Sequence, residues 1–234
     1  PTNFLEAMIA AQEAEGIGFS DSDIFANVCT LLLAGEDTTA NTIAWSVNFF
    51  LQYPEHFARA RAEVDAVVAP AALPSSIEQT AQMPFIEAFY SEAMRLKPVA
   101  PLNAMEPLED VELCGYLIPR GTAITMLNRR IANQDENFGA AARFDPERWL
   151  TPAEARGCPH DTSAFLPFGT GPRFCPGRNL ALLQIRTVLA MLCRNFEIAL
   201  AEPGRAVEEK LAFTMMPTNL VVRMRRRAGT ATET

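Results

Sequence analysis

Apolar residues follow helical spacing through most of the chain and strand spacing in one short region. The longest helical pattern runs from Asp21 to Tyr53 and ends at Pro54. Ser20 and Asp23 provide a capping box at its start. Such a helix is about 48 Å long at 1.5 Å per residue. Because it is apolar almost all round, the pattern predicts a central and buried helix.

Other segments predict shorter elements around this helix. Further helices are expected over residues 3–15, 54–69, 84–97 and 178–195, with residues 15–20 as a linker. Residues 111–127 predict short strands around a Pro-Arg-Gly turn, residues 128–164 are mostly loop, and residues 212–225 predict a final hairpin. The expected fold is mainly α with a small β portion, in one cooperative unit.

Composition narrows the functional class. The 234 residues are 49% hydrophobic and carry a net charge of -8, which excludes a disordered chain and argues against a nucleic-acid partner. The basic cluster at residues 223–227 is predicted to be a solvated tail. No stretch has the apolar length of a membrane span, although an anchor upstream of the chain stays an open question.

Cysteine usage points to a reducing compartment. The count is odd and the positions are scattered, so no disulfide framework is indicated. We therefore expect a cytoplasmic protein. The five cysteines are Cys29, Cys114, Cys158, Cys175 and Cys193.

A polar interruption lies in the middle of the long helix, in the stretch LLLAGEDTTANTIAW. Gly35 in a helix interior costs about 1 kcal/mol relative to alanine. Glu36 and Asp37 cost more if they are buried without partners, and Thr38 can bond back to a helix carbonyl. Either these residues form a notch with a hydroxyl and a proton source, or the two carboxylates lie on a solvent-exposed stripe.

A second set of charges lies on the helix at residues 84–97. Glu92 and Arg95 are three residues apart and therefore share a face. One interpretation is a surface ion pair of little energetic consequence. The other is a network completed by Arg148, which follows in the stretch FDPERWL and would pin the surrounding loops.

The stretch FLPFGTGPRFCPGRNL carries the most specific chemistry. Cys175 lies just before a helix, where the helix dipole and free N–H groups stabilise a thiolate. Phe168 could lie against a flat ligand, and Arg173 could pair with a carboxylate on its rim. A flat, carboxylate-bearing ligand with a central metal is heme. Glycines that allow close backbone approach are Gly169, Gly171 and Gly177.

Two other roles for this cysteine are possible. A zinc site could use Cys158, His160 and Cys175, although a fourth ligand and the usual spacing are missing. A Cys–His nucleophile could use His56 or His160.

Four segments together resemble the cytochrome P450 family. FGTGPRFCPG resembles its heme-binding loop, AGEDTT its oxygen-activation motif, EAMR its Glu-x-x-Arg helix and PERW the partner motif of that helix. Their order and rough spacing also agree with the family. The resemblance covers only the C-terminal half of a family member, so residues 1–234 are expected to be that part of a single domain, without its N-terminal half.

The resemblance implies a role for each matching residue. Cys175 would be the axial ligand of the iron of heme b, and Arg173 would hold a heme propionate. Asp37 and Thr38 would be the acid–alcohol pair that manages protons. The other implied positions are Phe168, Gly169, Gly171 and Gly177 in the heme loop, Ala34 and Gly35 at the oxygen site, Glu92, Arg95 and Arg148 in a folding triad, and Val99, Ala100, Phe213 and Thr214 at the substrate pocket.

The implied activity is O2- and NAD(P)H-dependent hydroxylation of an apolar organic substrate. Electrons would come through a redox partner, with a diflavin reductase favoured over a ferredoxin. Alternatives are a peroxide-using or isomerase-type member of the same family and a non-catalytic fragment that at most binds heme. The chain departs from the family where PVAPLNAME lacks an arginine and NQDENF replaces a common His-Arg pair.

Overall fold

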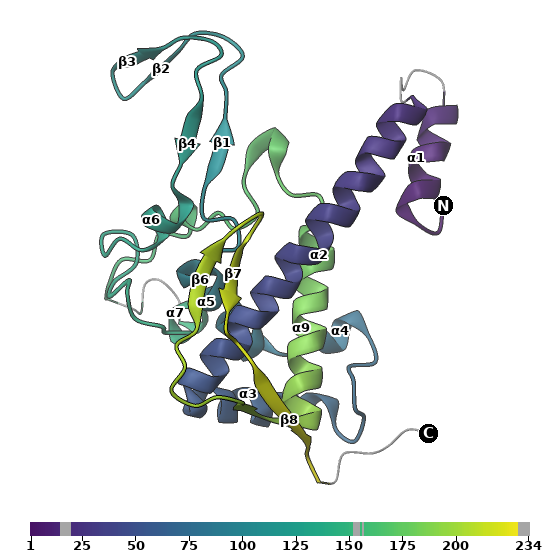
Figure 1. Ribbon diagram of the computed structural model, residues 1–234, viewed down its shortest axis with the longest axis vertical. Coiled ribbons are helices and arrows are strands. Elements are labelled where there is room, and N and C mark those ends of the chain that lie inside the picture. Colours follow the sequence, from purple (N-terminus) through teal and green to yellow (C-terminus); the bar gives the residue numbers. More distant parts are fainter. Residues whose placement is uncertain (15–19, 152–154, 156, 229–234) are drawn as a thin grey trace.

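The computed structural model describes residues 1–14, 20–151, 155 and 157–228, so the predicted linker at 15–20 lies almost entirely outside the described residues. Its longest elements are helices that lie against one another (Figure 1). The helices are α1 (Phe4–Glu13), α2 (Asp21–Gln52), α3 (Pro54–Val68), α4 (Ile77–Thr80), α5 (Pro84–Leu96), α6 (Asn128–Ala132), α7 (Glu147–Leu150) and α9 (Arg178–Asn195).

The strands form antiparallel pairs, and together with the helices they make the mainly α fold with a small β portion that the sequence predicts. The pairs are β1 (Asn103–Met105) with β4 (Ile124–Met126), β2 (Val111–Leu113) with β3 (Tyr116–Ile118), β5 (Phe196–Leu200) with β8 (Val222–Arg226), and β6 (Glu208–Leu211) with β7 (Met215–Thr218).

Local signals set the boundaries of the long helices. Ser20 and Asp23 form the predicted capping box at the start of α2, with each side chain bonded to the backbone N–H of the other residue. Pro54 occupies the first turn of α3, and Pro84 does the same in α5. The predicted bounds of α2, α3 and α5 each extend one residue beyond the observed C-terminal end.

The core lies where α2, α3, α5 and α9 meet. Phe50 of α2 stacks on Phe89 of α5, with ring centroids 4.1 Å apart, and on Phe57 of α3 at 4.7 Å. Phe49 stacks on Phe144, from the loop before α7, at 4.3 Å. These contacts hold α5, which carries the predicted triad, against the second half of α2.

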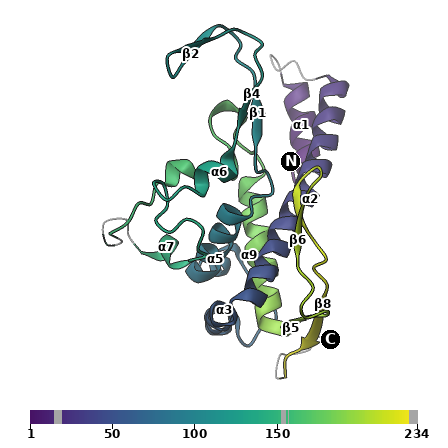
Figure 2. The same ribbon diagram turned by 60° about the vertical axis from the view of Figure 1, so that its left-hand side comes forward.

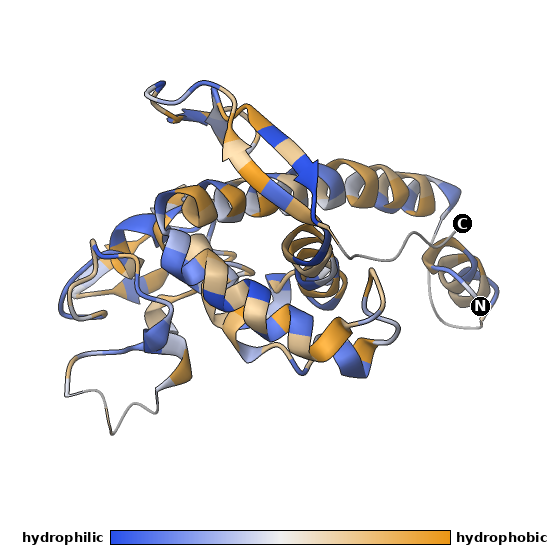
Figure 3. Cartoon of the chain, turned by 90° about the horizontal axis from the view of Figure 1, so that it is seen from below, coloured by the Kyte–Doolittle hydropathy of each residue, from blue (hydrophilic) through white to orange (hydrophobic). Residues whose placement is uncertain are grey.

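The prediction that α2 is buried along its whole length is wrong. Its second half packs in the core around Trp45 and Phe50, but the first half projects beyond the other helices with α1 alongside it (Figures 1 and 2). Phe25, Leu32 and Leu33 are exposed there. Figure 3 shows hydrophobic residues continuing along this part of the helix. The apolar pattern is real, but among the described residues only α1 covers part of it.

The predicted final hairpin at residues 212–225 is also wrong. β7 pairs with β6, which precedes it, and β8 pairs with β5, which directly follows α9. Most of the basic cluster is therefore in a strand rather than a tail, and its last residue, Arg227, pairs with Asp65 at 2.7 Å. The predicted Pro-Arg-Gly turn does form, since N of Thr122 donates to O of Pro119 at 3.2 Å. None of the helices in the described ranges has the length and apolarity needed to cross a bilayer.

Candidate functional site

The loop before α9 holds Cys175 close to the start of that helix. The Cys175 N–H donates to O of Phe168 at 2.9 Å, which closes the loop. Gly169 and Gly171 have φ values of 68° and 65°, a left-handed conformation that favours glycine. Cys175 is half-buried, and α9 begins at Arg178. Cys175 is thus partly exposed and lies three residues before the first residue of α9.

The other cysteines offer no comparable site. All five fall within the described residues and are free thiols. Burial raises the pKa of the Cys193 thiol far above its ordinary value, so this residue is chemically inert in the folded chain. Cys158 packs against the backbone of Gly139, where an added Cβ would meet the Cys158 Cβ at 2.8 Å.

The alternatives to heme find no support in the described part of the chain, which includes Cys158, His160 and Cys175. It contains no group of three or more His, Cys, Asp or Glu side chains that could hold a metal ion. His160 packs edge-on against Phe138, with centroids 5.1 Å apart, and His56 lies among core aromatic rings. Neither the zinc site nor the Cys–His nucleophile is therefore favoured.

These residues do fit a heme. A single thiolate suits an iron whose equatorial ligands come from a porphyrin. On α2, a Cβ added at Gly35 would meet nothing within 4 Å, and the same holds at Gly171 of the loop. Both α2 and the loop therefore expose backbone that a flat group can approach. The loop leads into the N-terminal end of α9, and this end of the helix lies beside the middle of α2 (Figure 1). Arg173 is exposed on the loop.

The polar interruption of α2 divides into two parts. Glu36 is exposed, as the solvent-stripe interpretation expects, but Asp37 and Thr38 are half-buried. The Thr38 hydroxyl donates to O of Ala34 at 2.7 Å, which is the predicted back-bond. The Asp37 carboxylate lies 3.5 Å from the hydroxyl of Thr214, which belongs to the turn between β6 and β7. The helix therefore has an acid and an alcohol at consecutive positions, each with a different hydrogen-bond partner.

Glu92 and Arg95 form a buried pair, so the surface interpretation is wrong. Both side chains are 0% exposed, and Arg95 donates to the Glu92 carboxylate at 2.7 and 2.9 Å. Nε of Arg148 donates to Oε1 of Glu92 at 2.9 Å, which gives the expected network. Trp149, which was not predicted, joins the network, since its Nε1 donates to Oε2 of Glu92 at 2.9 Å. The sequence position of Trp149, directly after Arg148, was the one local indication that it could join this network.

This network connects α5 to the coil that leads to the cysteine loop. Nη1 of Arg95 donates to O of Ala132 at 2.8 Å, and Nη1 of Arg148 donates to O of Gly139 at 3.2 Å. The ring of Trp149 lies 4.7 Å from that of Phe165, at the start of the cysteine loop. The buried charges thus join α5 to the segments that support the loop.

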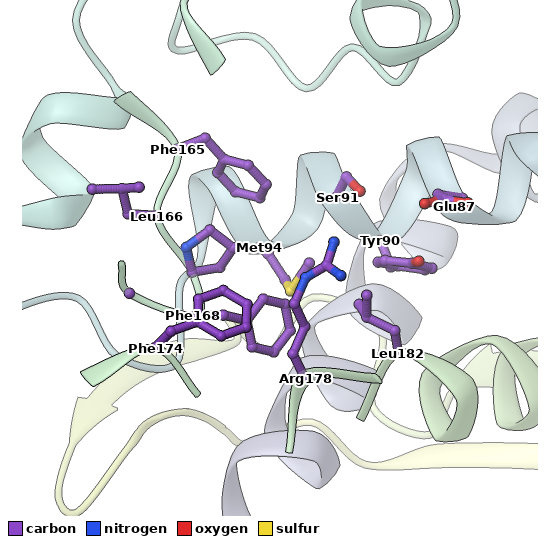
Figure 4. A pocket seen from close by; sticks show the side chains of 12 residues that line it. Glu87, Tyr90, Ser91, Met94, Phe165, Leu166, Phe168, Phe174, Arg178 and Leu182 are labelled. Carbon is purple, nitrogen blue, oxygen red and sulfur yellow. The ribbon is translucent and has the colours of Figure 1, made fainter. Parts of the chain in front are cut away.

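A small pocket separates α5 from the cysteine loop (Figure 4). Its volume is about 170 Å³, below the roughly 300–1,000 Å³ that is typical of small-molecule sites. Tyr90 of α5 lines one side, and burial raises its pKa to about 12 although the nearby Arg186 donates to it. Phe168 lines another side, with the Arg178 guanidinium 5.9 Å from its ring. We assign no substrate to this pocket.

The four residues predicted at the substrate pocket occupy two neighbouring segments. N of Met215 in β7 donates to O of Val99 at 2.8 Å, which joins the segment after α5 to the β6–β7 hairpin. Val99 and Ala100 are half-buried, and Phe213 is exposed. Thr214 instead is buried against α2.

Comparison with known proteins identifies the relatives of this architecture. The family model described as Cytochrome P450 matches residues 1–224. The human mitochondrial 25-hydroxyvitamin D-1 alpha hydroxylase is 35% identical over 83% of this chain and 38% of its own length. A self-sufficient cytochrome P450 monooxygenase of Aspergillus niger is 33% identical over 93% of this chain and 20% of its own length.

A solved structure gives the same result. The crystal structure of the cytochrome P450DA heme domain superposes with a TM-score of 0.82 and 28% identity, over 93% of this chain and 47% of that one. The chain spans less than half the length of each of these proteins.

Proposed function

Because the chain belongs to the cytochrome P450 family, we propose that it is the part of a monooxygenase that ligates heme iron and manages protons. The complete enzyme would hydroxylate an apolar organic substrate with O2 and electrons from NAD(P)H. Heme b, when bound, would supply the iron centre at which dioxygen is activated. The observation that carries the proposal is the accessible thiol of Cys175, in a glycine-containing loop at the start of α9.

The loop residues would divide the binding of the heme between them. Cys175 would ligate the iron as a thiolate, and the exposed Arg173 would pair with a heme carboxylate. Phe168, which packs on the core, would lie against the porphyrin and limit access of water to the sulfur. Gly177, where a Cβ would lie 3.8 Å from the Cys175 sulfur, keeps that side of the sulfur open.

Asp37 and Thr38 would hold and pass protons. The Thr38 hydroxyl now donates to the Ala34 carbonyl, so its oxygen lone pairs can accept a further hydrogen bond. Asp37 precedes it on the helix and is only half-buried, so its carboxylate can exchange protons with solvent. Together they would form a relay from solvent to the exposed backbone at Gly35.

Electron supply and location are part of the same proposal. We favour a diflavin reductase as the redox partner, and one relative named above is described as self-sufficient. Five free cysteines suit a reducing compartment such as the cytoplasm. Reconstitution with a diflavin reductase should support substrate-dependent NAD(P)H oxidation, and reconstitution with a ferredoxin should support less.

Thiolate ligation is tested directly by supplying hemin to the chain. Hemin should protect Cys175 from iodoacetamide, as read by mass spectrometry, and carbon monoxide added to the reduced sample should give a red-shifted Soret band. Cys175→Ser should abolish the red-shifted band, whereas Cys114→Ser, at an exposed thiol in the β2–β3 turn, should change neither the band nor the protection of Cys175. If Cys175 stays fully reactive with hemin present and no metal is retained, the proposed function is wrong.

The peroxide-using alternative is tested at Thr38. Thr38→Ala should lower the fraction of electrons recovered in product, because the proton relay loses its hydroxyl. The matched control is Thr30→Ala on the exposed half of α2. The Thr30 hydroxyl also donates to the carbonyl four residues earlier, that of Ala26. Unchanged electron recovery in Thr38→Ala would favour an enzyme that uses peroxide.

A further inference from the structure

A buried threonine links the β6–β7 turn to the acid on α2. Thr214 is 3% exposed, and its hydroxyl oxygen accepts a hydrogen bond of 2.9 Å from Nδ2 of Asn41. The same hydroxyl lies 3.5 Å from Oδ2 of Asp37. Since Asn41 is the donor to this oxygen, the hydroxyl hydrogen of Thr214 can be directed to the carboxylate. The order of donation is Asn41 to Thr214 to Asp37.

We propose that Thr214 is a positioning residue for Asp37, and that through it the position of the β6–β7 turn controls proton handling on α2. This inference depends on the proposed role of Asp37. Asp37 and Asn41 are four residues apart and share one face of α2. The turn lies along that face, so Thr214 can contact both side chains at once.

Two further hydrogen bonds fix the turn on this face. Nε1 of Trp45, one turn beyond Asn41, donates to O of Met215 at 3.0 Å. N of Met215 donates to O of Val99 at 2.8 Å. Glu209 on β6 also pairs with Lys97 at the end of α5 and with Arg129. The turn is therefore held between α2 and the segment after α5.

Through this arrangement, a substrate bound next to the turn can change the contact between Thr214 and Asp37. Phe213 is exposed next to Thr214, and Val99 is bonded to the strand that follows it. A molecule that packs on Phe213 or Val99 presses on the turn and shortens the contact between Thr214 and Asp37. At 3.5 Å this contact is long, and catalytic hydrogen bonds commonly tighten only in the complex with substrate.

The first test needs no heme. In the chain labelled with ¹³C, the side-chain carboxyl resonance of Asp37 should move in Thr214→Val, which removes the hydroxyl but keeps the shape. It should stay near its original position in Thr214→Ser, which retains the hydroxyl. The matched control is Thr218→Val on β7, the strand that follows the turn, because that hydroxyl donates to O of Glu208 instead. An Asp37 resonance that is the same in all four proteins overturns the inference.

The second test uses the heme-loaded protein. Thr214→Val should lower kcat about tenfold with little change in KM, as expected for the loss of one hydrogen bond to a charged group. Thr214→Ser should restore most of the activity. If the serine variant is as impaired as the valine variant, packing rather than the hydroxyl matters and the inference is wrong. If the complete wild-type enzyme binds hemin but does not hydroxylate, the proposed function fails, and the carboxyl resonance still decides the inference.

Discussion

Two pairs of Glu and Arg with the same sequence spacing lie in opposite environments. Glu92 and Arg95 are fully buried, whereas Glu202 and Arg205 are each about half exposed. Glu92→Gln should lower the free energy of unfolding by about 3–5 kcal/mol, because Arg95 and Arg148 are then buried without a counter-charge. Glu202→Gln should cost less than about 1 kcal/mol. Urea unfolding of both variants measures the difference, and equal costs would contradict it.

Asp65 should make the free energy of unfolding depend on pH in the acid range. Burial raises the pKa of Asp65, but hydrogen bonds from Arg227 and Arg194 outweigh burial and bring the pKa below its ordinary value of 3.8. The folded state therefore gains stability from this group above pH 3.8 and loses it as the pH falls through the lowered value. Asp65→Asn should be less stable than wild type at neutral pH, and the difference should shrink as the pH falls below 3.8. Unfolding measured across pH tests this, and a constant difference would contradict it.

Residue-scale signals predicted the site unevenly. Two short stretches of sequence contain the predicted site residues. One holds Cys175 and the glycines around it, and the other holds Asp37 and Thr38. The hydrogen bond from Thr214 to Asp37 joins positions 177 apart in sequence, and no local pattern indicates it. Asn41 was not predicted either, because its spacing from Asp37 indicates a shared helix face but not the bond to Thr214.

At the scale of elements, helices were predictable and strand partners were not. The start of α2 depends on a capping box within four residues, and the starts of α3 and α5 depend on one proline each. A strand needs a partner from elsewhere in the chain. The predicted hairpin at residues 212–225 contained most of β8 but gave it the wrong partner, because β8 pairs with β5 at the end of α9.

The coil that supports the triad should be sensitive to a single methyl group. A Cβ at Gly139 would meet the Cβ and sulfur of Cys158 at 2.8 and 3.1 Å, so Gly139→Ala forces one segment to move. The expected cost is about 1–3 kcal/mol of unfolding free energy, as for other overpacked sites. Because O of Gly139 also accepts from Arg148, the variant should bind hemin more weakly.

A second substitution separates crowding from other effects. Combining Gly139→Ala with Cys158→Gly removes the two atoms that the new Cβ would crowd, and leaves only Pro159 Cδ in ordinary contact at 3.6 Å. The double variant should therefore be more stable than the sum of the two single changes predicts, as measured by a double-mutant cycle in urea. Strict additivity would show that the two segments do not meet in this way.

At the scale of the whole molecule, the first half of α2 presents an apolar face that neither α1 nor the other described elements cover completely. Phe25, Leu32 and Leu33 lie at positions i, i+7 and i+8 and are 71%, 69% and 68% exposed. Soluble monomers rarely expose a large contiguous apolar patch. The sequence correctly predicted apolar character here, but burial also requires an element to pack against it.

This face should make the chain self-associate. Replacing Phe25, Leu32 and Leu33 by Gln should reduce both the apparent mass in sedimentation and the binding of an apolar dye, because the shared surface is lost. The free energy of unfolding should change by less than about 0.5 kcal/mol per residue, as for other surface substitutions. The matched control replaces Leu108, just before the β2–β3 hairpin, and Leu117, within it. These residues are 87% and 70% exposed. Association that persists in the α2 variant and disappears in the control would place the contact on the hairpin instead, since the two surfaces lie on opposite sides of the upper part of Figure 1.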